Sequence, residues 1–204
     1  LRPDHLGCYG YHRDTSPNID CIAKDGVIFT RAISQGSVTI VSLASFLTGV
    51  YPVKHGIITQ HLDYNKDFYH STILEILNKK GYSTAAFFAH PLLSIVPWAK
   101  RDASYNFLAK GRCSTTLTDS ALDWLNKNHK KPFFVWMHYM SPHTPYTPPH
   151  PYNEIYLNDD FYGDDILLNF VDNLEGKGGI PPDAVIGDIR NLNYYIAQYD
   201  GEIK

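Results

Sequence analysis

The sequence predicts an α/β fold in which helices flank a mainly parallel central sheet. Two apolar runs, residues 84–89 and 132–139, have the length of strands. The first is apolar on both faces, which is typical of a central strand in a parallel sheet, and the second is the strongest strand pattern in the chain. Helical patterns alternate with these runs, as they do in α/β domains.

The first part of the chain predicts a loop, a helix and a short strand. Residues 1–11 are rich in Gly, Pro and Tyr, as in a loop that follows a strand. Residues 16–20 predict a helix start, with Ser16 as the cap and a proline in the first turn, and Gly26 ends this helix. Its expected inner face consists of Ile19, Ile22 and Ala23. Residues 27–33 then predict a strand.

The segment 35–52 predicts a hydroxyl-rich turn that leads into a short apolar helix. Four apolar residues fall at helical spacing: Leu43, Ala44, Phe46 and Leu47. Gly49 is suited to a left-handed cap and Pro52 lies just beyond it, so the helix begins near Thr39 to Ser42. Unpaired N–H groups and the helix dipole favour sulfate or phosphate there, which makes a hydroxyl at this point a candidate nucleophile. The alternative is that Thr39 and Ser42 merely cap the helix.

Three further segments complete the expected secondary structure. Residues 55–69 lack a period and predict a loop, whereas Ser71 caps a helix that Gly81 ends. The apolar side of that helix is formed by Ile73, Leu74, Ile76 and Leu77. A helix is expected over 119–128, and another from about residue 183 to 204. Their apolar sets are Leu122, Trp124 and Leu125 in the first, and Leu192, Tyr195, Ile196, Tyr199 and Ile203 in the second.

Residues 144–182 predict a long surface excursion that shapes a substrate pocket, because they contain many Pro, Gly, Tyr and acidic residues without a sustained period. The aspartate pairs at 159–160 and 164–165 do not fit a helix–loop–helix calcium site, which needs oxygen ligands at alternate positions and a closing glutamate. A solvated acidic loop is therefore expected there.

Composition excludes several classes of protein. The chain has 204 residues, of which 44% are hydrophobic and 19% charged, as in one globular domain or most of a larger one. A net charge of -3 without a basic stripe argues against nucleic-acid binding. No apolar run reaches the roughly 20 residues that span a bilayer.

The three cysteines, Cys8, Cys21 and Cys113, have neither zinc-site nor disulfide spacing. They are expected to be buried apolar fillers, and they favour a cytoplasmic location. The chain opens at Leu1 without a methionine, so the true N-terminus and any targeting segment are expected to lie outside it.

A histidine cluster follows the strongest strand. His143 lies between two prolines at the carboxyl end of that strand, where open α/β sheets place their ligand sites. It could hydrogen-bond a sulfate or phosphate oxygen or protonate a leaving group, or it could only satisfy loop carbonyls. His138, inside the strand pattern, is expected to be a packed core residue.

Several motifs in the chain resemble those of the sulfatase family of the alkaline phosphatase superfamily. They occur in the family's usual order and cover nearly the whole chain apart from residues 150–190. The matching stretches are residues 1–11, 15–20, 44–52 with His55-Gly56, 132–134, 142–146 and 199–203.

The resemblance implies an α/β enzyme that hydrolyses sulfate or phosphate esters with a divalent metal. The family's nucleophile, also a metal ligand, lies ten residues before the helix-ending glycine, which corresponds to Thr39 here. Sulfatases carry a C-x-P-x-R motif there, whose cysteine or serine becomes formylglycine. This chain has Thr39-Ile40-Val41-Ser42-Leu43 instead, so no formylglycine is expected. Related phosphodiesterases and phosphoryl transferases use an unmodified threonine.

The resemblance also assigns other site residues. His143 matches the substrate-binding histidine, and His90 is the one candidate to replace a lysine and a histidine that this sequence lacks after residues 81–84. Calcium is the expected metal, with manganese or zinc as alternatives, and its other ligands are expected outside the chain. Asp4 is expected to fix the N-terminal loop. The chain thus resembles the N-terminal part of a catalytic domain, inactive by itself.

Three functions follow from these observations. The first is a sulfatase-like hydrolase acting on a small anionic ester, with Thr39 as nucleophile and His143 contacting the anion. The second is a phosphodiesterase or phosphoryl transferase, which an unmodified threonine favours. The third is an inactive binding protein that keeps the fold. Neither a nucleic-acid partner nor a membrane span is expected, and the sequence leaves the oligomeric state open.

Overall fold

The structure is a computed structural model, and its residues fall into two compact units. Unit 1 comprises Leu1–Thr30 and Ser141–Lys204, and unit 2 comprises Arg31–Met140. The described residues are 1–59, 70–90, 93, 103–111, 114–158, 163, 166–173 and 177–204.

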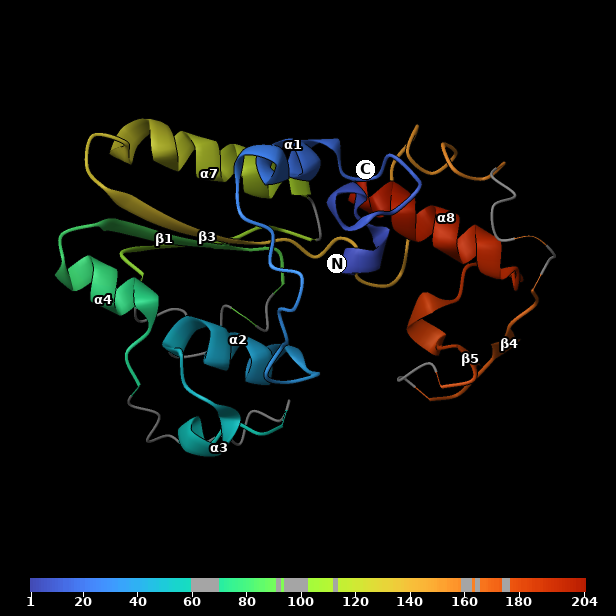
Figure 1. Cartoon of the computed structure of the whole chain (residues 1–204), viewed down its shortest axis with the longest axis horizontal. Coiled ribbons are helices and arrows are strands. Elements are labelled where there is room, and N and C mark those ends of the chain that lie inside the picture. Colours follow the sequence, from blue (N-terminus) through green and yellow to red (C-terminus); the bar gives the residue numbers. More distant parts are fainter. Residues whose placement is uncertain are drawn as a thin grey trace. The chain divides into compact units, whose positions relative to one another are not determined.

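Unit 2 is built on a three-stranded parallel sheet with the strand order β2-β1-β3. The central strand β1 (Ser83–Phe88) pairs with β2 (Tyr105–Leu108) on one side and with β3 (Phe133–His138) on the other; β1 and β3 are labelled in Figure 1. Ala85 is in register with Tyr105 on one side and Val135 on the other. The predictions of a parallel sheet and of a central strand near residues 84–89 are confirmed.

Helices cover both faces of this sheet (Figure 1). On one face, α7 (Ser114–Asn128) packs against Ala85 and Phe87 of β1. On the other face, α2 (Thr39–Thr48) and α4 (Ile73–Lys79) pack against Ala86 and Phe88. Neighbouring residues of a strand point to opposite faces, so an all-apolar β1 supplies both cores. A short helix α3 (Pro52–His55) follows α2.

Two helix starts in unit 2 differ from the predictions. The cap of α4 is Thr72 and not Ser71, because the Thr72 hydroxyl accepts a hydrogen bond from Glu75 N at 3.3 Å. A hydroxyl residue three positions before a glutamate is the usual capping-box spacing. Helix α7 begins at Ser114, before the predicted residue 119, because fully buried Leu117 adds another apolar contact at its start.

Unit 1 combines short helical turns with one longer helix. Its N-terminal segment forms η1 (Pro3–His5), η2 (Gly7–Tyr9) and α1 (Pro17–Asp25). The C-terminal segment forms a two-residue parallel pair, β4 (Asn169–Phe170) with β5 (Gly179–Ile180), then η3 (Pro182–Ala184) and α8 (Leu192–Ile203). The side chain of Asn191 caps α8, so this helix starts later than the predicted residue 183.

The predicted strand over residues 27–33 is wrong. These residues adopt no regular secondary structure, and Val27, Phe29 and Ile33 are 81%, 71% and 82% exposed. A strand is stable only when its backbone pairs with a neighbour, and no neighbouring strand pairs with this segment among the described residues.

The prediction that Ile19, Ile22 and Ala23 form a buried inner face of α1 is also wrong. Ile22 is 74% exposed, and no residue of α1 is buried. The helix is anchored by Asp20 instead, whose Oδ1 accepts hydrogen bonds from Cys8 N at 2.7 Å and Ser16 Oγ at 3.0 Å. Ser16 therefore occupies the N-cap position without capping the helix.

The two cysteines that the structure describes do not lie in the core. Cys21 is exposed and Cys8 half-buried, so the expectation of buried cysteines is wrong for both. Cys113 and the aspartate pairs at 159–160 and 164–165 lie outside the described residues. Among the helices that the structure describes, none has the length and apolar character needed to cross a bilayer. The predicted pocket-shaping role of residues 144–182 stays a prediction.

Candidate active site

The candidate nucleophile Thr39 is the first residue of α2 in unit 2. The N-cap is Val38, whose backbone is extended (φ -120°, ψ 150°), and the first helical hydrogen bond runs from Ser42 N to Val38 O at 3.0 Å. Thr39 therefore lies where the amide dipoles of a ten-residue helix end in partial positive charge. The predicted helix start and the left-handed stop at Gly49, with φ +68°, are confirmed.

Neither candidate hydroxyl of this turn caps the helix. Val38 has no hydroxyl, and the Ser42 hydroxyl is paired with Ser34 Oγ at 3.0 Å. Thr39 is half-buried, and its hydroxyl has no hydrogen-bond partner within the described part of the chain. The capping alternative is thus wrong, and the Thr39 hydroxyl can meet a ligand without breaking a bond of the fold.

The backbone before α2 approaches its first turn closely. A Cβ at Gly36 would lie 2.7 Å from Cγ1 of Val41, which is far too short for two carbon atoms. The buried face of α2, with Ile40 at 0% and Leu47 at 2% exposed, fixes the helix against the sheet. Packing and the close turn together hold the position of Thr39.

A buried serine–histidine pair fastens α2 to α3. His55 Nε2 lies 2.9 Å from Ser45 Oγ, and the two residues are 4% and 5% exposed. Ile57 N donates to His55 Nδ1 at 3.1 Å, so the neutral ring carries its proton on Nε2 and donates it to the serine. Burial, and then the nearby His70, lower the pKa of His55. The pair therefore positions α2 and does not activate Ser45 as a nucleophile.

This pair is not predicted from the sequence, in which residues 55–69 are expected to be loop. His55 instead ends α3, and residues 60–69 lie outside the described residues. The available signal was Ser45 itself. It is a polar residue on the apolar face of a predicted helix, and such a residue needs a buried partner.

The stability of the protein is expected to depend on pH through His55. The lowered pKa means that the unfolded chain, with an ordinary histidine pKa near 6.5, binds this proton more readily than the folded protein. Neutral His55 therefore contributes its full share to the free energy of unfolding above about pH 6.5, and this share is lost as the pH falls toward the folded-state pKa.

His55→Gln keeps a donor for Ser45 but does not titrate. We expect it to cost about 1 kcal/mol at pH 8, through an imperfect hydrogen bond, and to lose stability less steeply between pH 6.5 and 5. Urea unfolding at pH 8, 6.5 and 5 measures both quantities. An identical pH slope in the wild type and the variant would contradict this prediction.

The candidate anion-binding residue His143 lies in unit 1, in an exposed loop. Its Nδ1 is 3.0 Å from Thr144 O, so a ring that carries its proton on Nδ1 donates to this carbonyl. The two roles considered for His143 do not exclude each other, because the ring contacts a loop carbonyl and also lines a cavity.

The cavity beside His143 has a volume of about 730 Å³, within the range of about 300–1,000 Å³ typical of small-ligand pockets. All its lining residues belong to unit 1. Its polar side is formed by Arg2, His143, Thr144, Tyr146 and Asp183. The principal apolar residues are Leu168, Ile180, Ala184, Leu192 and Tyr195.

The charge of Arg2 in this cavity is balanced by Asp4. Arg2 Nε and Nη2 contact the two carboxylate oxygens of Asp4 at 3.0 and 2.5 Å. This hydrogen bonding raises the pKa of Arg2 and lowers the pKa of Asp4. Asp4 thus pairs within the N-terminal loop, in agreement with the expected loop-fixing role.

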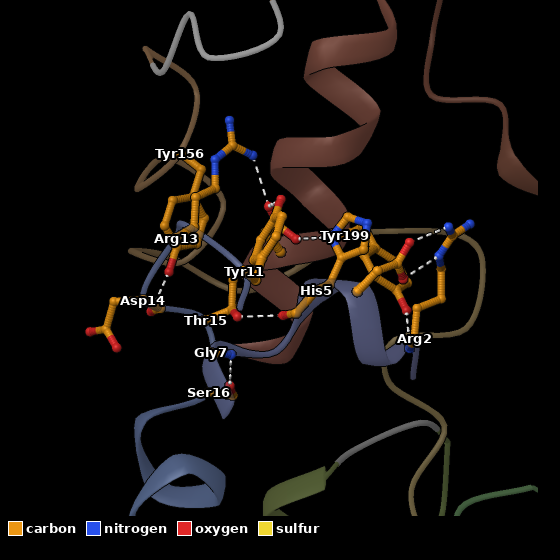
Figure 2. A network of polar contacts seen from close by, with 12 residues as sticks. Arg2, His5, Gly7, Tyr11, Arg13, Asp14, Thr15, Ser16, Tyr156 and Tyr199 are labelled. Carbon is orange, nitrogen blue, oxygen red and sulfur yellow. Dashed lines mark hydrogen bonds and ion pairs between the residues drawn. The ribbon is translucent and has the colours of Figure 1, made fainter. Parts of the chain in front are cut away.

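A buried carboxylate joins the N-terminal loop to α8 in unit 1 (Figure 2). Asp200 is 0% exposed, and its oxygens contact His5 Nδ1 at 2.6 Å, Tyr11 Oη at 2.6 Å and Arg13 Nη1 at 2.8 Å. Tyr156 covers the Arg13 guanidinium, 5.4 Å from its ring centroid. In the sequence, Asp200 stands out only as part of the stretch 199–203 that resembles the family, and no local pattern reveals partners so distant in the chain.

Two other histidines considered in the sequence, His138 and His90, lie near the carboxyl end of the unit 2 sheet. His138 is the last residue of β3, in register with Phe88, and His90 follows β1 by two residues. His138 is half-buried, so the prediction that it is a packed core residue is only partly confirmed. Burial first, and His90 second, lower the pKa of His138. The substrate-binding role of His90 stays a prediction.

The described residues do not by themselves form a metal site. They contain no group of three or more His, Cys, Asp or Glu side chains able to hold an ion. Thr39 would supply one oxygen ligand at most, and a divalent metal needs several.

Comparison with known proteins agrees with this architecture. The sequence model of the sulfatase family matches residues 1–201. The chain belongs to the sulfatase family. Members of this family generally bind a divalent metal.

The chain is also similar in sequence to individual sulfatases. An N-acetylglucosamine-6-O-sulfatase of Bacteroides thetaiotaomicron is 26% identical over 193 residues, which cover 85% of this chain and 34% of that protein. Human arylsulfatase H is 32% identical over 100 residues, covering 41% of this chain and 18% of that protein. This sulfatase-family chain thus spans about a third or less of the length of these relatives.

A solved sulfatase-like fold also matches. The structure of BT4656 in complex with its substrate D-glucosamine-2-N,6-O-disulfate has a TM-score of 0.65 and 23% identity, and the match covers 78% of this chain and 36% of that one. At this identity the comparison supports the fold, which is the α/β architecture predicted from the sequence.

Proposed function

We propose that the protein hydrolyses sulfate esters, with the unmodified Thr39 hydroxyl as nucleophile and His143 as a contact for the anion. The observation that carries this proposal is the position of Thr39. It occupies the first turn of α2, its hydroxyl is not used by the described fold, and it lies ten residues before Gly49, where the family places its nucleophile. A helix start of this kind favours both a bound anion and a developing alkoxide.

The proposed reaction proceeds through a covalent enzyme. Thr39 Oγ1 attacks sulfur, the new O–S bond forms, and the S–O bond to the alcohol breaks. The Thr39 proton passes to solvent, and the alcohol oxygen takes a proton from His143 or from water. Water then attacks the sulfur of the modified threonine, which releases sulfate with a proton and restores the hydroxyl.

A phosphodiesterase or phosphoryl transferase is the second candidate. The unmodified threonine favours it, because the related enzymes that use an unmodified threonine as nucleophile are phosphodiesterases and phosphoryl transferases, whereas sulfatases carry a residue that is converted to formylglycine. The same geometry at the start of α2 serves either anion.

We also propose that the complete enzyme needs one divalent metal, as members of the family generally do. Calcium is the first candidate by the family resemblance, with manganese and zinc as alternatives. Bound near the nucleophile, such an ion would stabilise the negative charge of the reacting ester. Thr39 is the one described residue proposed as a ligand.

The proposed substrate is a small anionic ester of a sugar. Two comparisons support this choice: the N-acetylglucosamine-6-O-sulfatase relative, and BT4656, whose substrate is a glucosamine disulfate. The cavity beside His143 has a volume suited to such a molecule.

The test compares three substrates with the full-length protein supplied with calcium, manganese or zinc. An aryl sulfate, a bis-aryl phosphate and a 6-O-sulfated hexosamine are assayed under identical conditions. Faster cleavage of the sulfates supports the first proposal, and faster cleavage of the phosphate supports the second. If none of the three substrates is hydrolysed, both proposed activities are wrong. The hypothesis that then remains is a binding protein of the same fold.

A further inference from the structure

We propose that the cavity beside His143 binds the alcohol part of the ester as a hydroxylated ring that carries a protonated amine, with Asp183 as the partner of the amine. This inference rests on the proposed ester hydrolysis, because it names the group attached to the anion that His143 contacts. It concerns the Asp183 side of the cavity, to which neither the sequence motifs nor the family resemblance assigns a role.

Asp183 has the geometry of a prepared acceptor. Its Oδ2 accepts a hydrogen bond from Thr144 Oγ1 at 2.6 Å, which orients the carboxylate. Thr144 is the neighbour of His143, and all three residues line the same cavity. Among the residues that the structure describes, no cation pairs with Asp183, and its Oδ1 has no hydrogen-bond partner.

The charges of the cavity favour a cationic substituent. Arg2, its one described Lys or Arg, is held by the Asp4 carboxylate through two contacts. Its positive charge is therefore compensated, whereas the negative charge of Asp183 is not. A second sulfate or carboxylate on the ring would meet this charge with repulsion, and an ammonium group would be attracted to it.

The remaining lining suits a sugar ring. Ile180, Ala184 and Tyr195 line the cavity and give an apolar wall for the C–H face of the ring. Tyr146 Oη has no hydrogen-bond partner among the described residues. Burial first, and the charge of Asp183 second, raise the pKa of Tyr146, so its phenol keeps the proton and can donate it to a ring hydroxyl.

The experiment varies one substituent of the ligand. The full-length protein is assayed with glucosamine 6-O-sulfate whose nitrogen is free, acetylated or sulfated. We expect kcat/KM to be about tenfold higher for the free amine than for the acetylated ester, as for one charge-assisted contact, and lowest for the N-sulfated ester. Asp183→Asn is expected to bring the free-amine to N-acetyl ratio to about one.

Matched variants separate charge from structure. Asp188→Asn removes the same charge from an exposed position that does not line the cavity, so its ratio is expected to equal that of the wild type. Thr144→Val removes the bond that orients Asp183 and is expected to reduce the preference partly. An equal loss of rate on all three esters in Asp183→Asn, or a wild-type preference for the N-sulfated ester, overturns the inference.

Binding of the product distinguishes this inference from the proposed function. Calorimetry compares free glucosamine with N-acetylglucosamine on the wild type and Asp183→Asn. Amine-dependent binding that Asp183→Asn abolishes supports the inference even if no ester is hydrolysed, in which case only the proposed activity fails. Equal binding of both sugars overturns the inference, whatever the activity.

Discussion

Thr39→Val is expected to lower kcat of the full-length enzyme by about a thousandfold or more, as does removal of other catalytic nucleophiles. Valine keeps the shape and the branching at Cβ but lacks the attacking oxygen. Because the Thr39 hydroxyl makes no hydrogen bond within the described fold, the free energy of unfolding is expected to change by less than about 1 kcal/mol. Steady-state kinetics and urea unfolding measure the two effects.

Two control variants and one direct measurement make the result specific. Thr39→Ser keeps a hydroxyl and is expected to retain part of the rate. Ser42→Ala removes the other hydroxyl of the same turn, which is bound to Ser34, and is expected to remain within a few-fold of the wild type. Mass spectrometry after rapid quenching is expected to find a sulfuryl or phosphoryl group on Thr39. Full turnover by Thr39→Val, or an equal loss in Ser42→Ala, contradicts the nucleophile role.

Asp200→Asn is expected to destabilise the protein by about 3–5 kcal/mol, because it removes the carboxylate charge that the buried Arg13 guanidinium contacts. Arg13 is 4% exposed and contacts Asp200 at 2.8 Å, so water cannot readily replace the carboxylate. Two further donors, on His5 and Tyr11, also lose a charged acceptor. Urea unfolding followed by circular dichroism measures the loss.

Asp14→Asn is the matched control for this buried pair. Asp14 pairs with Lys204 at 2.7 Å, but its side chain is 73% exposed, so the pair is screened by solvent. Its removal is expected to cost about 0–1 kcal/mol. Losses of similar size in the two variants would show that the Asp200 network contributes no more than a surface ion pair.

The features predicted correctly from the sequence are those set by local patterns. The doubly apolar run that became β1 indicated a central parallel strand before any partner was known, because both its faces had to be buried. Gly49 ended α2 as expected, since a left-handed residue strongly favours glycine. That stop also fixed the position of Thr39 at the other end of a short helix.

The features that the sequence analysis missed depend on partners far along the chain. Residues 27–33 have the composition of a strand, but composition does not supply a neighbour to pair with. His55 was expected in a loop because nothing near it in the sequence shows that it would hydrogen-bond to Ser45. The surroundings of Asp200 and Asp183 likewise arise only when distant segments fold together.

The network around Asp200 also bears on the order in which the protein can fold during synthesis. Its bonds to His5, Tyr11 and Arg13 join residues 187 to 195 positions apart, and the whole of unit 2 lies between them in the chain. Contacts over such separations form late, whereas the sheet of unit 2 is made from a continuous segment. Unit 2 can therefore acquire its structure on the ribosome while the N-terminal loop of unit 1 still awaits α8. The helix that carries Thr39 is then in place before the cavity of His143 exists.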